Sequence, residues 1–131
     1  MSDPKHILII DDDRIVAEAL KMVIVNTATQ PVEVDVALTG ASGFDAIMFN
    51  PYDLVFMDLR MPHWNGPEVV QSLKMVNASV RVVIYSGCVQ EFRSELAELG
   101  VDAILQKPCP AQTIRDTVSR LLADTPQDAK V

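Results

Sequence analysis

Residues 7–13 read Ile7-Leu8-Ile9-Ile10-Asp11-Asp12-Asp13, an apolar run that ends directly in three carboxylates. A second apolar run, residues 54–57, ends in the same way at Asp58. Short runs that are apolar throughout are typical of strands covered on both faces of a parallel sheet. Carboxylates that end two such strands share one edge of the sheet, where open α/β sheets place their chemistry. Crowded carboxylates repel one another, so a cation or a proton is needed to relieve them.

The composition is that of one ordinary globular domain. The chain has 131 residues, of which 49% are hydrophobic and 22% charged, and its formal net charge is −7. This charge, with 11 scattered basic residues, argues against direct nucleic acid binding. No apolar stretch approaches the ~20 residues of a membrane span, and the first residues lack a secretory pattern. Cys88 and Cys109 make no disulfide framework, so we expect a cytoplasmic protein without a membrane association.

Apolar runs alternate with helical patterns along the chain. The predicted strands are residues 7–10, 32–38, 54–57, 80–85 and 103–105. Glu33 and Asp35 interrupt the second of these runs, which predicts an edge strand. The alternation predicts right-handed crossovers and an α/β fold of the flavodoxin-like, doubly wound kind, with a five-stranded parallel sheet and five helices. The pattern does not give the strand order, but in such a fold the crevice lies over the ends of the first and third strands.

The helices are predicted between these strands. The first should bury one apolar stripe formed by Ile15, Val16, Ala19, Leu20, Val23 and Ile24. The second should begin near Thr39, the third after Asn65-Gly66 and the fifth near Pro110, while the fourth should span residues 90–99. We expect residues 1–5 to be a disordered N-terminus, residues 6–123 to be one domain, and residues 124–131 to be a flexible tail or the start of a linker.

Two more polar residues end strands at the same edge. Ser86 ends the fourth predicted strand and Lys107 follows the fifth. Each residue type has a use in phosphoryl chemistry. Carboxylates hold Mg²⁺, one carboxylate can be the nucleophile that becomes an aspartyl phosphate, and a hydroxyl and an ammonium can bind the remaining phosphoryl oxygens.

This set of residues resembles the receiver domain of two-component response regulators. The match is carried by residues 7–13, by Met57-Asp58-Leu59-Arg60-Met61-Pro62, by Tyr85-Ser86-Gly87 and by Lys107-Pro108. The resemblance implies that Asp58 is the phosphoacceptor and becomes a 4-aspartylphosphate. It also implies a Mg²⁺ site in which Asp11, Asp12 and Asp58 take part together with the backbone carbonyl of Arg60.

The resemblance extends to the switch and to the partners. Ser86 would move to hydrogen-bond the phosphoryl group, Lys107 would pair with Asp58, and the Lys107–Pro108 peptide would be cis. A histidine kinase or phosphotransfer protein would donate the phosphoryl group. An effector domain or protein, or a second copy of the chain, would read the result. Such a chain catalyses only its own phosphorylation and dephosphorylation and is not classed as an enzyme.

One position departs from the family pattern, and two others are positions that vary within the family. Ile104 stands where receivers often carry an aromatic residue, so the usual relay toward the fourth helix and fifth strand is in doubt. Arg60 and Cys88 stand at the two variable positions that tune the lifetime of the phosphoryl group. Neither is a carboxylate or amide that would orient an attacking water. We therefore hypothesise slow self-dephosphorylation.

Two other functions remain as alternatives. A phosphohydrolase of the haloacid dehalogenase type also uses an aspartate nucleophile with Mg²⁺, but its nucleophile ends the first strand in an Asp-x-Asp-x-Thr pattern. Here Ile15 stands in place of that threonine, and 131 residues leave no room for a cap domain. The other alternative is a degenerate receiver that serves only as a docking module, against which the intact Asp12, Asp58, Ser86 and Lys107 argue.

Overall fold

The structure, a computed structural model, describes residues 3–123. The strands of its main sheet are β1 Lys5–Ile10, β2 Val32–Ala37, β3 Leu54–Met57, β6 Arg81–Ser86 and β7 Ala103–Gln106. The helices are α1 Arg14–Thr27, α2 Gly40–Phe49, α3 Gly66–Val76, α4 Arg93–Leu99 and α5 Ala111–Ala123. Two short strands, β4 Arg60–Met61 and β5 Trp64–Asn65, pair with each other, and a 3-10 turn, η1 Val89–Phe92, precedes α4. All five predicted strands are therefore present, and β1 begins two residues earlier than predicted.

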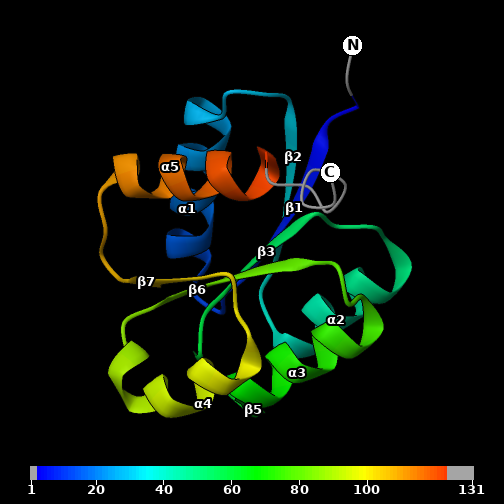
Figure 1. The fold of residues 1–131 in the computed structure, drawn as a ribbon, viewed down its shortest axis with the longest axis vertical. Helices are drawn as coiled ribbons and strands as arrows, with labels where there is room; N and C mark the ends of the chain where they lie inside the picture. Colours follow the sequence, from blue (N-terminus) through cyan, green and yellow to red (C-terminus); the bar gives the residue numbers. More distant parts are fainter. Residues whose placement is uncertain (1–2, 124–131) are drawn as a thin grey trace, which may run out of the picture.

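The main sheet is parallel throughout, in the order β2-β1-β3-β6-β7 (Figure 1). This is the predicted flavodoxin-like fold, and the predicted edge position of residues 32–38 is confirmed. Because β1 and β3 are neighbours, the residues that follow them, Asp11 and Asp58, meet at one edge. The backbone N–H of Asp58 donates to the carbonyl of Ile10 at 3.0 Å, so the pairing continues to the acidic residues.

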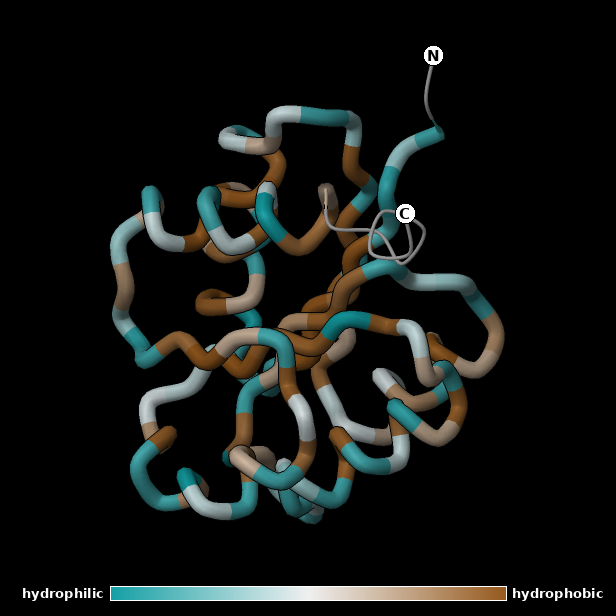
Figure 2. Tube along the Cα trace, in the orientation of Figure 1, coloured by the Kyte–Doolittle hydropathy of each residue, from teal (hydrophilic) through white to brown (hydrophobic). Residues whose placement is uncertain are grey.

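Helices cover both faces of the sheet. Side chains alternate along each strand, so Ile7 and Ile9 pack with α1 and α5, whereas Leu8 and Ile10 pack with α2, α3 and α4. The central strands form the hydrophobic centre of the molecule in Figure 2. In the described part of the chain, no helix is both long enough and apolar enough to span a bilayer.

The predicted buried stripe of α1 is partly wrong. Leu20 and Ile24 are buried as predicted, but Ile15 is 81% exposed, and Ala17 is buried in its place. The helix carries apolar residues on two faces, and hydropathy alone does not say which face the sheet covers. The carboxylate of Asp13 caps α1 by accepting hydrogen bonds from the N–H groups of Ile15 and Val16, which orients its first turn beside the acidic edge.

Two glycines place α2 and α3 close to the functional edge. A Cβ at Gly43 would lie 2.6 Å from Ile10 Cδ1, and a Cβ at Gly66 would lie 2.7 Å from the carbonyl oxygen of Leu59. At Gly66 the near atoms belong to the backbone, so only a residue without a side chain allows this approach, whereas at Gly43 the side chain of Ile10 would have to shift. The two helices therefore pack closely against the segments that carry Asp11 and Asp58.

The predicted fourth helix, residues 90–99, is divided in two. Its first turn is the 3-10 turn η1, and the α-helix begins at Arg93. It ends at Gly100, which adopts the left-handed conformation with φ of 70°, as a C-terminal glycine stop does. The fifth helix begins at Ala111, next to the predicted Pro110, and the predicted C-terminal tail lies outside the described residues.

Candidate functional site

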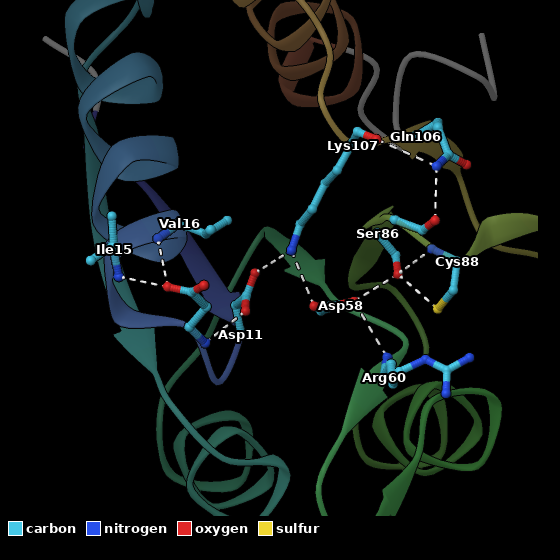
Figure 3. A network of polar contacts seen from close by, with 11 residues as sticks. Asp11, Ile15, Val16, Asp58, Arg60, Ser86, Cys88, Gln106 and Lys107 are labelled. Atoms are coloured by element: carbon cyan, nitrogen blue, oxygen red, sulfur yellow. Dashed lines mark hydrogen bonds and ion pairs between the residues drawn. The ribbon is translucent and has the colours of Figure 1, made fainter.

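The carboxyl ends of four strands bring the predicted site residues together. Asp11 follows β1, Asp58 follows β3, Ser86 is the last residue of β6, and Lys107 follows β7. Figure 3 shows the side chain of Lys107 reaching across the edge toward Asp11 and Asp58. Residues up to 96 positions apart in the chain thus share one site.

Lys107 joins the two carboxylates. Its Nζ lies 2.7 Å from Asp11 Oδ2 and 3.1 Å from Asp58 Oδ2. Burial alone would lower the pKa of Lys107, but the hydrogen bond to Asp11 and the charge of Asp58 outweigh it, so the pKa lies above its usual value. The ammonium also lies 5.4 Å from the ring centroid of Tyr85, which is within range of a cation–π attraction. The lysine is therefore a fixed positive charge in the site.

Asp11 is the most enclosed of the acids, with 3% of its surface exposed. Its Oδ1 accepts a hydrogen bond from the N–H of Asp13 at 2.9 Å, and its Oδ2 accepts the one from Lys107. Burial raises the pKa of Asp11 above its usual value, because the hydrogen bonds from Lys107 and Asp13 only partly offset the loss of water. The site therefore holds this carboxylate in an environment that disfavours its charge.

Asp58 receives donors on both carboxylate oxygens. Oδ1 accepts a hydrogen bond from Ser86 Oγ at 2.7 Å and one from the N–H of Arg60 at 3.3 Å, while Oδ2 faces Lys107. Ser86 is fully buried, and its Oγ also accepts the N–H of Cys88 at 3.3 Å. A hydroxyl, a backbone amide and an ammonium thus converge on one carboxylate. Such a set of donors suits a group that is about to carry more negative charge.

Asp11, Asp12 and Asp58 have the donor chemistry of a hard cation site. One carboxylate oxygen from each lies within 4.8 Å of the others. Asp12 is exposed, so solvent and ions reach the cluster. Hydrogen bonds from the N–H of Asp13 and from Ser86 Oγ hold the carboxylates of Asp11 and Asp58 in place. Oxygen ligands that are partly fixed and open to water suit Mg²⁺, which keeps several of its waters. The residues present therefore fit the expected metal.

The structure also places the variable positions. Arg60 has its backbone beside Asp58, but its guanidinium pairs with Glu91 of η1. Cys88 Sγ lies 3.3 Å from Ser86 Oγ. Ile104 is 39% exposed on the edge strand β7, two residues before its end, so it lies apart from the cluster of donors. The Lys107–Pro108 peptide is cis, as predicted.

Sequence reasoning missed three neighbours of the site. The sequence assigns no role to Glu91 or Gln106, and Tyr85 enters only as a member of the motif Tyr85-Ser86-Gly87. Gln106 Nε2 donates to the carbonyl of Gly87 at 2.9 Å and so ties the loop after β6 to the end of β7. The position of Tyr85 directly before Ser86 was a usable signal, but nothing in the sequence pairs Arg60 with Glu91.

A family model matches most of the chain. The model described as the response regulator receiver domain matches residues 7–119. Among curated proteins, the transcriptional regulatory protein YesN of Bacillus subtilis is 27% identical over 119 residues, which are 90% of this chain and 32% of that protein. Sporulation initiation phosphotransferase F of the same organism is 28% identical over 119 residues, 90% of this chain and 94% of that protein. The chain spans about a third to a half of the length of several curated relatives that it matches, YesN among them.

Solved structures have the same fold. A receiver domain protein of Methanospirillum hungatei superposes with a TM-score of 0.87 at 21% identity, covering 96% of this chain and 99% of that one. At this identity the likeness concerns the fold alone.

Proposed function

The chain belongs to the response regulator receiver domain family, and on that premise we propose that Asp58 accepts a phosphoryl group in a Mg²⁺-dependent transfer. The observation that carries the proposal is the pair of donors on its carboxylate. Ser86 Oγ lies 2.7 Å from Oδ1 and Lys107 Nζ lies 3.1 Å from Oδ2.

The donor is a phosphohistidine of a histidine kinase or phosphotransfer protein. A carboxylate oxygen of Asp58 forms the new bond to phosphorus, the P–N bond breaks, and its electron pair stays on the imidazole nitrogen. Lys107 neutralises charge that develops on the phosphoryl oxygens, and the hydroxyl of Ser86 turns from the carboxylate to one of them. The contacts that Ser86 and Lys107 make with Asp58 support these roles.

Receiver domains use an acidic cluster for Mg²⁺, and this chain has such a cluster. We assign the metal to the carboxylates of Asp11, Asp12 and Asp58 and to the backbone carbonyl of Arg60. Bound there, the ion neutralises charge on the transferred group and reduces the repulsion among the acids. Asp11, whose pKa burial raises, has the most to gain from a cation.

The phosphoryl group acts as a signal. The aspartyl phosphate carries a charge of about −1.5 to −2, where the carboxylate carried −1, beside the loops that follow β3 and β6, and so biases two arrangements of these loops. An effector domain or protein, or a second copy of the chain, reads the difference. We propose that this phosphorylation and its readout take place in the cytoplasm. The chain remains a substrate that helps its own modification, and it turns over no other compound.

Mass spectrometry after reaction with acetyl phosphate and Mg²⁺ tests the proposal. We expect the wild type to gain the mass of one phosphoryl group and Asp58→Asn to gain none. Asp13→Asn is the matched control, because Asp13 caps α1 and should leave labelling intact. Labelling of Asp11 instead would favour a phosphohydrolase of the haloacid dehalogenase type. An unlabelled wild type would favour the docking module.

A further inference from the structure

Arg60 contacts Asp58 through its backbone but not through its guanidinium. Its backbone N–H donates to Asp58 Oδ1 at 3.3 Å, whereas its guanidinium forms an ion pair with the carboxylate of Glu91 in η1. In Figure 3 the side chain of Arg60 starts beside Asp58 and points away from it. The two partners of the ion pair are 65% and 58% exposed, so water surrounds the pair.

The guanidinium is nevertheless close to the reacting group. A hydrogen bond with Cys88 and the pairing with Glu91 raise the pKa of Arg60. Cys88 Sγ in turn lies 3.3 Å from Ser86 Oγ, which lies 2.7 Å from Asp58 Oδ1. Two small side chains therefore separate the guanidinium from the carboxylate. The side chain of Arg60 also has several rotatable bonds between its backbone N–H, which donates to Asp58 at 3.3 Å, and its guanidinium.

The charges favour such a movement once Asp58 is phosphorylated. In the unmodified site the charge of Lys107 is shared by Asp58 and Asp11, and the guanidinium of Arg60 is paired with Glu91 instead of with these acids. An aspartyl phosphate carries a charge of about −1.5 to −2 in place of the −1 of the carboxylate, and Lys107 shares its single charge with Asp11. The fork of an arginine matches phosphoryl oxygens, and an exposed ion pair such as the one with Glu91 holds it only weakly.

Building on the proposed phosphorylation of Asp58, we propose that Arg60 is a second cationic ligand of the phosphoryl group. Until Asp58 is modified, the guanidinium of Arg60 stays paired with Glu91. When Arg60 leaves Glu91, η1 loses its tie to the segment that follows β3. Because η1 leads directly into α4, the state of Asp58 reaches α4 by this exchange. The route needs no aromatic residue at Ile104.

A double-mutant cycle tests the exchange. Beryllium fluoride with Mg²⁺ serves as a non-transferable mimic of the phosphoryl group, and the fluorescence of Trp64, the single tryptophan, reports its binding. We expect Arg60→Met to weaken binding about two- to fivefold and Glu91→Gln to tighten it by a similar factor. In the Arg60→Met background, Glu91→Gln should have no effect, because its partner is gone.

The controls distinguish the exchange of partners by Arg60 from a general effect of negative charge near the site. Glu95→Gln removes an equal charge from the first turn of α4 and should tighten binding less than Glu91→Gln does. Arg60→Lys keeps the charge but loses the fork, and should fall between the wild type and Arg60→Met. Circular dichroism shows that each variant is folded before its affinity is compared.

Three results would overturn the proposal. These are an unchanged affinity in Arg60→Met, equal tightening by Glu91→Gln in both backgrounds, and equal tightening by Glu95→Gln and Glu91→Gln. If acetyl phosphate labels Asp58 and the cycle is additive, only the exchange is wrong. If the wild type is not labelled, the proposed function fails and the exchange fails with it.

Discussion

The ammonium of Lys107 lies between the carboxylates of Asp11 and Asp58 and is shared by both. One positive charge therefore balances two negative ones, and Asp12 adds a third acid nearby. Within residues 3–123 every buried side-chain nitrogen or oxygen has a hydrogen-bond partner. The buried polar atoms of the unmodified site are thus hydrogen-bonded, but the site is still short of positive charge, which is the condition that favours a cation.

Asp11→Asn should make the protein more stable at pH 7 in the absence of metal. Because the pKa of Asp11 in the folded state lies above its usual value of 3.8, the ionised carboxylate destabilises the fold, and protonation removes this effect as the pH falls. The gain from Asp11→Asn should therefore be full at neutral pH and vanish below about pH 3.8. Urea unfolding in EDTA at several pH values measures it. Asp45→Asn on α2 is the exposed control, and a less stable Asp11→Asn at pH 7 would contradict the prediction.

The phosphoryl group on Asp58 should be lost slowly. Arg60 and Cys88 present a guanidinium and a thiol beside the site, and neither accepts a proton from an attacking water as a carboxylate does. We expect the half-life of the purified phosphoprotein to be longer than seconds. Mass spectrometry at intervals after removal of the phosphoryl donor measures it. Arg60→Glu places a carboxylate there and should shorten the half-life. A half-life of seconds in the wild type would refute this expectation.

At the scale of elements, α3 is fitted against the backbone that carries Asp58. Gly66 begins this helix and lies against Leu59, the residue after Asp58. A Cβ there would be 2.7 Å from the carbonyl oxygen and 2.8 Å from the Cα of Leu59, and backbone atoms cannot yield as the end of a side chain can. The position of the helix and the position of the Asp58 carboxylate are therefore linked.

Gly66→Ala should lower the free energy of unfolding by about 1–3 kcal/mol, because the segment after Asp58 must shift to make room. It should also slow the labelling of Asp58 by acetyl phosphate. The matched control is Gly87→Ala, where a Cβ meets nothing within 4 Å, and we expect a change within about 0.5 kcal/mol there. Equal effects of the two substitutions on unfolding in urea would be inconsistent with this packing.

At the scale of the whole molecule, Mg²⁺ should stabilise the fold. A ligand that binds only the folded state adds RT ln(1 + [L]/Kd), which is about 2.7 kcal/mol when its concentration is 100 times Kd. We expect the midpoint of thermal unfolding to rise with MgCl₂ and to return to its starting value with EDTA. Asp12→Asn should remove most of the shift. An equal shift in that variant would place the ion elsewhere.

Much of this molecule could be predicted from its sequence. Strands such as residues 54–57 are apolar throughout, so their ends, and hence the edge shared by Asp11 and Asp58, follow from the pattern. The buried face of α1 could not be predicted, because Ile15 and Ala17 are both apolar and only the packing decides between them. The pair of Arg60 and Glu91 could not be predicted either, since it depends on how two exposed side chains turn in space.

The distance in sequence between Asp11 and Lys107 has a consequence for the making of the protein. The acids of β1 leave the ribosome early, and the lysine leaves it 96 residues later. A chain that is cut or stalled before residue 107 carries the acids without their cation. The ion pair between the first strand and the segment after β7 therefore forms only once synthesis has passed β7.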